Sequence, residues 1–118
     1  METLTKVLCC GDRNWTDYSK IFIRLSKLSK DTIIIQGEAR GADLLSKRAA
    51  IKLGLKHLDF PANWAKYGKA AGPKRNKQML EQLPDLVIAF HSNIESSKGT
   101  KNCIEQAKKR NIQVEIIK

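Results

Sequence analysis

Apolar residues recur along the chain at two spacings, one typical of buried strands and the other of helices. Short runs of aliphatic and β-branched residues predict five strands, at residues 6–11, 32–36, 55–60, 85–90 and 112–117. Between these runs, apolar residues repeat every three or four positions and predict four helices, at residues 18–29, 44–53, 73–83 and 100–110. The pattern therefore predicts strand and helix in alternation, with one helix between each pair of consecutive strands.

This alternation is typical of a three-layer α/β sandwich, with a mainly parallel five-stranded sheet and helices on both of its faces. The sequence has neither a linker nor a repeat, so we expect a single domain over residues 1–118. Ligands of such sheets bind beyond the carboxyl ends of the strands. The loops after the first four strands, at residues 11–17, 37–43, 61–72 and 91–99, are therefore expected to form the site.

The net charge of the chain is +10, which favours anionic partners such as nucleotides, nucleic acids or acidic surfaces. The lysines are spread along the sequence and aromatic residues make up only 6% of it, so the interleaved aromatics of single-strand-binding platforms are missing. A small nucleotide-derived molecule is therefore the favoured partner, and nucleic acid the less favoured one.

No stretch has the apolar length needed to cross a bilayer, and the chain enters a strand pattern near its start without a signal peptide. Cys9 and Cys10 are adjacent in the first strand, and Cys103 lies alone in the last helix. This spacing fits neither a disulfide framework nor a metal site. We expect a cytoplasmic protein with no membrane partner, no metal and no cofactor.

The loop at residues 37–43 connects a buried strand to a helix and contains two glycines, Gly37 and Gly41. We expect Gly37 to adopt backbone angles closed to other residues, and Gly41 to let a ligand or another backbone come close. The unpaired amides that open the next helix, such as that of Ala42, then form an anion site, most often for phosphate. The alternative is a simple strand-to-helix turn with Asp43 as a carboxylate of the first helical turn.

Three residues in the loop after the first strand have chemistry suited to a nucleotide. Arg13 offers a rigid fork of donors that matches phosphate or carboxylate. Asp12 can accept hydrogen bonds from ribose hydroxyls or orient Arg13, and Trp15 can stack on a base or cover the end of the sheet. The alternative is an Asp–Arg turn with a tryptophan that only packs.

The two later helices also begin with suitable residues. Gly72 and Arg75 lie near a helix start, where a cation opposes the helix dipole unless an anion binds there. Gly99 and Thr100 open the last helix and supply amides and a hydroxyl for a second phosphate, or form an N-cap. Both helix starts are therefore candidates for anion binding.

Several familiar nucleotide and hydrolase motifs are absent from the sequence. It contains no Walker A lysine pattern, no zinc-ligand cluster and no nucleophile elbow, and the first strand is not followed by Gly-x-Gly-x-x-Gly. An ordinary dehydrogenase is therefore disfavoured. Glycosidic chemistry usually uses a carboxylate pair, and the carboxylates at the predicted edge are Asp12, Glu38, Asp43 and Glu95.

Three motifs occur in order along the chain: Gly11-Asp12-Arg13-x-Trp15, Gly37-x-Ala39-x-Gly41-Ala42-Asp43 and Pro61-Ala62-x-Trp64-x-x-x-Gly68-x-x-Ala71-Gly72-Pro73-x-Arg75-Asn76-x-x-Met79. Together they resemble the YspA-like, cpYpsA-related branch of the SLOG superfamily, which includes the DprA (SMF) and LOG-like proteins. The resemblance implies a Rossmann-like fold that binds nucleotides or nucleotide derivatives. Some of these relatives hydrolyse the N-glycosidic bond of nucleoside monophosphates, others are thought to sense or sequester nucleotide signals, and DprA proteins bind single-stranded DNA.

The sequence departs from the LOG-like hydrolases at the last helix, where those enzymes carry Pro-Gly-Gly-x-Gly-Thr-x-x-Glu. Gly99 and Thr100 match that motif, whereas Ser96 and Ser97 stand at the paired glycines and Cys103 at the catalytic glutamate. The resemblance thus extends to the phosphate-binding half of the motif and not to its hydrolytic half. It also suggests a homo-oligomer, although the lysine-rich surface argues against a large apolar interface.

The first hypothesis is a nucleotide-binding domain that senses or sequesters a nucleotide signal. Phosphates would lie on the amides that open the second and last helices, and Trp15 or Trp64 would pack on the base or ribose. The residues expected to contact the ligand are Gly11, Asp12, Arg13, Trp15, Gly37, Ala39, Gly41, Ala42, Asp43, Trp64, Gly72, Arg75, Asn76, Gly99 and Thr100.

Two alternative functions remain open. One is an N-glycosidase that acts on a nucleoside phosphate, with Glu38 or Asp43 as the base or nucleophile. The other is a DNA- or RNA-binding module, whose affinity would fall steeply with salt.

Overall fold

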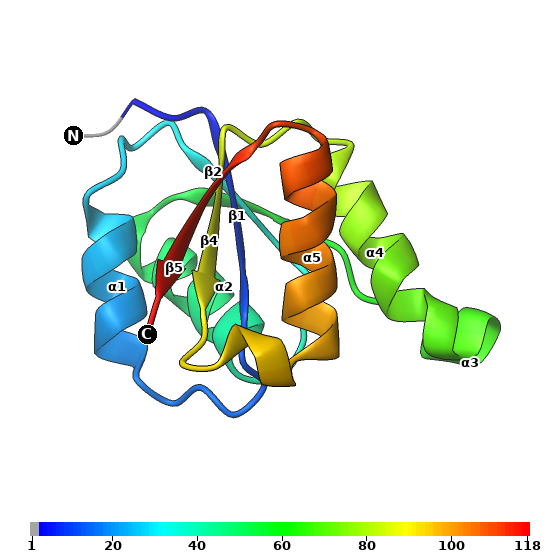
Figure 1. Ribbon diagram of the computed structural model, residues 1–118. Coiled ribbons are helices and arrows are strands. Elements are labelled where there is room, and N and C mark those ends of the chain that lie inside the picture. The colour runs from blue at the N-terminus through cyan, green and yellow to red at the C-terminus, as the bar shows by residue number, and fades with distance from the viewer. Residues whose placement is uncertain (1–2) are drawn as a thin grey trace.

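The computed structural model describes residues 3–118, which form a five-stranded sheet covered by helices (Figure 1). The strands are β1 (Lys6–Gly11), β2 (Ile33–Gln36), β3 (Lys56–Asp59), β4 (Leu86–Phe90) and β5 (Gln113–Ile117). They lie in the order β3-β2-β1-β4-β5, and every neighbouring pair is parallel. The predicted Rossmann-like α/β sandwich is confirmed, and its sheet is parallel throughout.

The helices are α1 (Tyr18–Ser26), α2 (Ala42–Leu53), α3 (Trp64–Tyr67), α4 (Ala71–Leu80) and α5 (Lys98–Lys109). Helices α1 and α2 pack together on one face of the sheet, and α4 and α5 pack together on the other (Figure 1). Short 3₁₀ turns, η1 (Gly68–Ala70) and η2 (Ile94–Ser96), precede α4 and α5. Helix α3 projects from the body of the molecule beyond the end of α4 (Figure 1).

The two central strands carry side chains into a core on each side of the sheet. In β1, Val7 and Cys9 belong to the core under α1 and α2, whereas Leu8 and Cys10 belong to the core under α4 and α5. All residues of β4 are buried. Strands buried on both faces have nearly continuous apolar sequences, so these two strands were the easiest to recognise in the sequence.

Capping residues decide where several helices begin and end. The Asp17 side chain accepts a hydrogen bond from the Lys20 amide and begins α1. The left-handed Gly54 (φ 74°) ends α2. Helix α4 begins at Ala71, before the predicted start, so that Pro73 is its third residue and not its first.

The connection predicted at residues 61–72 is not a plain loop. The Asn63 side chain accepts from the Lys66 amide at 3.1 Å, and this cap starts the single turn of α3. In the part of the chain described here, no helix is long and apolar enough to cross a membrane.

Candidate functional site

A cavity of about 870 Å³ opens at the carboxyl edge of the sheet, where the loops after β1 to β4 meet. Residues from each of those four loops line it, together with the first turns of α4 and α5. Eleven of the predicted ligand residues belong to its lining, namely Gly11, Asp12, Arg13, Ala39, Asp43, Trp64, Gly72, Arg75, Asn76, Gly99 and Thr100. The topology therefore brings residues almost ninety positions apart in sequence to one hollow.

Five predicted residues lie outside the cavity lining, namely Trp15, Gly37, Glu38, Gly41 and Ala42. Four of them belong to the loop at residues 37–43, and part of this loop packs closely against the backbone of the loop after β1. A Cβ atom at Gly41 would overlap the carbonyl oxygens of Asp12 and Arg13, and Gly41 has a φ of 80°. The Ala42 amide donates to the Asp12 carbonyl at 3.0 Å, so it is already occupied and is not the predicted phosphate donor.

Gly37 is needed for space rather than for unusual backbone angles. A Cβ atom there would overlap the Arg75 guanidinium. Gly37 itself has no positive φ, whereas its neighbour Glu38 has a φ of 56°. The Gln36 side chain is buried and accepts from the Glu38 amide at 2.6 Å, which holds that conformation.

The Glu38 carboxylate forms an ion pair with Lys47 at 3.5 Å, and Glu38 does not line the cavity. Of the two carboxylates predicted for catalysis, only Asp43 lines the cavity.

Asp43 is a buried carboxylate in the cavity wall, with 5% of its surface exposed. One carboxylate oxygen accepts from the Gly37 amide at 3.2 Å and from the Ala39 amide at 3.3 Å. Burial raises the pKa of Asp43 from 3.8 to about 6, against the opposing effects of the Arg75 charge and these two amides. The group is therefore mostly ionised at neutral pH and close to titration.

Arg75 and Asn76 connect two of the loops that surround the cavity. Arg75 donates from Nη1 to the Gly37 carbonyl at 2.8 Å and from Nε to the Asn76 side chain at 3.1 Å. Asn76 donates to the Gly99 carbonyl at 3.2 Å and to Asn102 at 3.1 Å. The predicted conflict between a cation and the α4 dipole is relieved by these contacts and by the nearby Asp43 charge.

The first turn of α5 presents backbone amides to the cavity. The Ser97 hydroxyl accepts from the Thr100 amide at 3.0 Å and caps the helix. The amides of Lys98 and Gly99 precede the first intrahelical hydrogen bonds, and both residues line the cavity. The Thr100 amide is therefore used by the cap, and the amides of this turn that remain without an intrahelical partner are those of Lys98 and Gly99.

The two tryptophans have different surroundings. The Trp15 ring packs at 5.9 Å from the Phe90 ring, and its indole nitrogen donates to the Asp17 carbonyl at 2.9 Å. Trp15 therefore covers the apolar core at the end of β4. Trp64 lines the cavity and is 48% exposed, and the Arg13 guanidinium lies 5.7 Å from the centre of its ring.

The cavity lining is predominantly basic. Its carboxylates are Asp12 and Asp43, and its cationic side chains are Arg13, Arg40, Lys69, Arg75 and Lys98. Arg40 was not predicted; it reaches across to the Arg13 carbonyl at 3.3 Å and to Asn14 at 3.3 Å. Its position in the sequence, between two residues of the glycine motif, was the signal that could have identified it.

Two cysteines that the sequence analysis did not assign to the site also line the cavity. Cys10, at the end of β1, and Cys103, in α5, are both buried there. Their hydrogen bond, together with burial, raises the pKa of the Cys10 thiol well above its usual range. Within residues 3–118, no three His, Cys, Asp or Glu side chains are grouped so that they could hold a metal ion.

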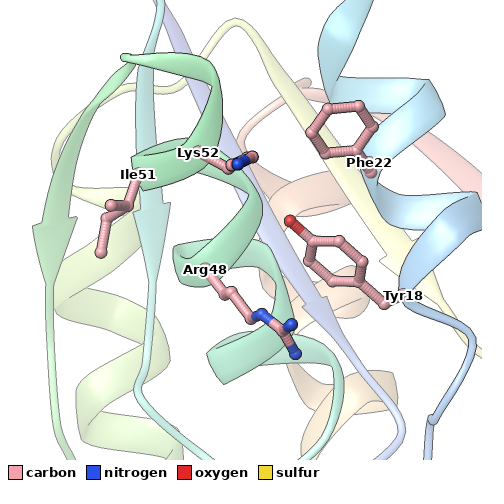
Figure 2. Close-up of a pocket in the computed structure, with 5 residues that line it drawn as sticks. All are labelled: Tyr18, Phe22, Arg48, Ile51 and Lys52. Carbon is pink, nitrogen blue, oxygen red and sulfur yellow. The ribbon is translucent and has the colours of Figure 1, made fainter.

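A second hollow, of about 450 Å³, lies between α1 and α2 (Figure 2). Its lining residues are Tyr18, Phe22, Arg48, Ile51 and Lys52, and none of them lines the larger cavity. It therefore takes no part in the candidate site at the sheet edge.

Known proteins resemble both the fold and the sequence of this chain. The structure of DNA processing protein A (DprA) from Streptococcus pneumoniae matches 96% of the chain with a TM-score of 0.77 and 19% identity. The chain spans 50% of the length of that protein, and at this identity the likeness shows the fold alone. The Gene 61 protein of Mycobacterium phage D29 is 30% identical in an alignment 122 residues long. The alignment includes 94% of this chain and 94% of the phage protein.

Residues 5–67 match the family described as YAcAr, YspA, cpYpsA-related SLOG family. The match includes the loops after β1 and β2 and ends at Tyr67, within the loop after β3. It covers more than half of the chain, and the phage relative covers nearly all of it. The chain therefore belongs to the YspA, cpYpsA-related SLOG family.

Proposed function

We propose that the cavity at the sheet edge binds a nucleotide or nucleotide derivative, and that the protein senses or sequesters a nucleotide signal in the cytoplasm. The observation that carries this proposal is the convergence of five cationic side chains and the first turn of α5 on one cavity of about 870 Å³. That volume is within the range of about 300–1,000 Å³ typical of small-molecule sites.

The α5 end of the cavity is suited to a phosphate group. The amides of Lys98 and Gly99 have no intrahelical partners, and the helix dipole adds partial positive charge at this end. The Lys98 side chain lies at the same place and adds a full charge. A phosphate bound here would receive backbone hydrogen bonds and a charge-assisted one.

The part of the cavity lined by Trp64 is suited to a base and ribose. Trp64 is 48% exposed, so it offers an aromatic surface for stacking. Arg13 lies beside that ring, and Lys69 also lines the cavity. Further phosphate groups of the ligand would therefore also meet positive charge. Asp12 lines the same cavity, and its carboxylate can accept hydrogen bonds from ribose hydroxyls.

The proposal is tested by incubating the purified protein with nucleoside mono- and triphosphates, NAD, ADP-ribose and cyclic nucleotides. Mass spectrometry then compares the retained and filtered fractions. We expect one compound to be retained intact, and its retention to fall about tenfold or more in Lys98→Glu and in Trp64→Ala. Lys108→Glu, an exposed site on the same helix outside the cavity, is the charge-matched control and should bind normally. Retention of nothing, or equal loss in the control, contradicts the proposal.

A second candidate is hydrolysis of the N-glycosidic bond of a nucleoside phosphate, which the Asp43 carboxylate supports. Water would add to the ribose carbon as the bond to the base breaks, giving a free base and a ribose phosphate. A buried carboxylate with a pKa of about 6 is suited to take up or release a proton near neutral pH. If this candidate is correct, free base appears in the same assay and Asp43→Asn abolishes its release while ligand is still retained.

A third candidate is nucleic-acid binding, supported by the segment at residues 60–80. It contains five Lys or Arg residues and no Asp or Glu, and its Trp64 and Tyr67 rings are 48% and 40% exposed. Exposed rings among cations are suited to stacking on unpaired bases. Two results would favour this candidate. The affinity for labelled single-stranded DNA would fall steeply as the salt concentration rises, and Tyr67→Ala would weaken the binding more than Tyr18→Ala does.

A further inference from the structure

The hollow between α1 and α2 is an apolar surface that the proposed nucleotide site leaves unused. Tyr18 and Phe22 line it from α1, and Arg48, Ile51 and Lys52 line it from α2 (Figure 2). The five side chains surround an open groove of about 450 Å³ on the outer side of the helix layer. A ligand at the sheet edge would touch none of them.

Large aliphatic side chains are exposed along this side of α2. Ile51 is 59% exposed and Leu44 is 44% exposed. Leu44 is one turn before Arg48, which is one turn before Ile51 and Lys52, so these residues form a single stripe on the helix surface. The stripe continues the apolar surface of the groove along the helix axis. Exposed aliphatic side chains that gather beside an apolar hollow mark an interaction site more often than isolated exposed residues do.

The charge beside the groove is entirely positive. Arg48 and Lys52 are its charged lining residues, and neither forms an ion pair within residues 3–118. Lys47, on the inner side of α2, differs because it pairs with Asp59 at 3.2 Å. The acidic residue of α1 and α2 is Asp43, which is buried at the other site.

Arg48 is held at the edge of the groove and not folded into it. Its guanidinium lies 4.6 Å from the centre of the Tyr18 ring, and Figure 2 shows the two side chains next to each other between α1 and α2. A cation stacked on an aromatic ring keeps its outer donors available for a carboxylate. Arginine and tyrosine are also among the residues that contribute most to binding at protein interfaces.

We propose that this groove docks an acidic amphipathic helix of a partner protein. Its apolar side chains would pack on Tyr18, Phe22 and Ile51, while its carboxylates would pair with Arg48 and Lys52. Charge complementarity selects this occupant over a second copy of the chain, because a symmetric dimer through the groove would place two grooves of the same positive charge against each other. The binding mode is that of an amphipathic helix in an apolar groove between two helices.

A displayed library of random peptides of about 16 residues, roughly 24 Å long as a helix, provides the probe. It is panned against the full chain, and the enriched peptides are synthesised and titrated by fluorescence anisotropy. We expect enriched peptides to combine Asp or Glu with Leu, Ile or Phe at helical spacing. Their affinity should fall about tenfold or more in Ile51→Asp and in the pair Arg48→Gln with Lys52→Gln.

Matched variants separate docking in the groove from general attraction to a basic protein. Ile23→Asp is the apolar control, because Ile23 is 56% exposed on α1 and does not line the groove. Lys108→Gln with Lys109→Gln is the charge control, because these exposed residues end α5 on the other side of the sheet. Both controls should bind the peptides as the parent protein does.

Three results would overturn the proposal. They are enrichment of peptides without acidic residues, equal loss of binding in the control variants, and self-association in sedimentation experiments that Ile51→Asp abolishes. Nucleotide retention is measured in the same groove variants and should not change, since the groove and the cavity have no lining residue in common. Failure of the peptide experiment therefore does not affect the proposed nucleotide function, and the reverse is also true.

Discussion

Asp43 has two roles that depend on the same carboxylate. It holds the loop after β2 by accepting from the Gly37 and Ala39 amides, and it places a negative charge in the wall of a basic cavity. Burial disfavours the charged form, and its pKa rises from 3.8 to about 6. The ionised carboxylate therefore destabilises the fold at neutral pH relative to its protonated form, by roughly 2–3 kcal/mol at about 1.4 kcal/mol per pKa unit.

The pH dependence of stability tests this reading of Asp43. Between pH 3.8 and about 6 the folded chain binds more protons at this group than the unfolded chain, so its contribution to stability is present at low pH and is lost as the pH rises through 6. Asp43→Asn removes that loss. The stability of the variant relative to the parent should therefore increase by roughly 2–3 kcal/mol between about pH 4 and about pH 7.5.

Urea unfolding of both proteins across this range measures the difference. The asparagine oxygen can still accept from the two amides, so any cost of the substitution itself is the same at each pH. The pKa of Asp59 is lowered by its contacts with His57 and Lys47, so its effect on stability changes with pH in the opposite direction. Both proteins contain Asp59, so this effect cancels when their stabilities are compared. A difference that stays constant with pH would contradict the raised pKa of Asp43.

At the scale of the element, the turn between β2 and α2 exists because another turn packs against it. The Ala42 amide donates to the Asp12 carbonyl, and Gly41 lies against the carbonyls of Asp12 and Arg13. The first amide of α2 is therefore used by the loop after β1. This contact fixes the relative position of two loops that both line the cavity.

Two glycines with similar φ allow the energetic cost of losing this contact to be distinguished from the cost of backbone strain. Gly41 has a φ of 80° and no room for a Cβ atom, whereas Gly54 has a φ of 74° and no atom within 4 Å of a Cβ. We expect Gly54→Ala to lower the free energy of unfolding by about 1 kcal/mol, the ordinary cost of a left-handed alanine. Gly41→Ala should lower the free energy of unfolding by about 3 kcal/mol or more. The alanine has the same backbone strain, and its Cβ atom also forces the two loops apart.

Chemical denaturation of the two alanine variants gives the comparison directly. Nucleotide retention supplies a second measurement, which should fall in Gly41→Ala and remain normal in Gly54→Ala. Equal destabilisation by the two substitutions would mean that the loops around Gly41 move apart without cost.

At the scale of the whole molecule, an ion pair connects α1 to β5 at the edge of the sheet. Arg24 donates from Nε to Glu115 at 2.6 Å and from Nη2 to the other carboxylate oxygen at 3.1 Å. The Arg24 side chain is 10% exposed. The pair thus joins two elements that are remote in sequence. Because the Arg24 side chain is mostly buried, water screens the attraction between the two charges less than at the surface.

A double-mutant cycle on Arg24→Gln and Glu115→Gln should give a coupling free energy of about 1–2 kcal/mol, between the values typical of exposed and of buried pairs. The comparison cycle uses Lys101 and Glu95, whose 2.9 Å contact has side chains 43% and 81% exposed. That coupling should be clearly smaller, since solvent and salt screen it. If the two cycles give the same value, burial of the Arg24 side chain does not strengthen its pair with Glu115.

Much of the fold could be predicted because its signals are local. The buried runs in β1 and β4, the cap at Asp17 and the glycine that ends α2 are all recognisable within a few residues. Helix α3 could not be predicted, because one turn started by Asn63 is too short for an apolar period. The start of α4 was displaced for a related reason, since the 3₁₀ turn η1 leads directly into it.

The sequence by itself determined the order of strands and helices along the chain, the edge of the sheet where the loops after β1 to β4 meet, and the membership of the family. Periodicity, capping and motif spacing are properties of neighbouring residues, so they need no folded chain to be recognised. Only the tertiary structure decided that Trp15 covers Phe90 while Trp64 lines the cavity, and that the Ala42 amide is occupied. These outcomes depend on close approach between loops remote in sequence, which strand order and packing establish and local pattern does not.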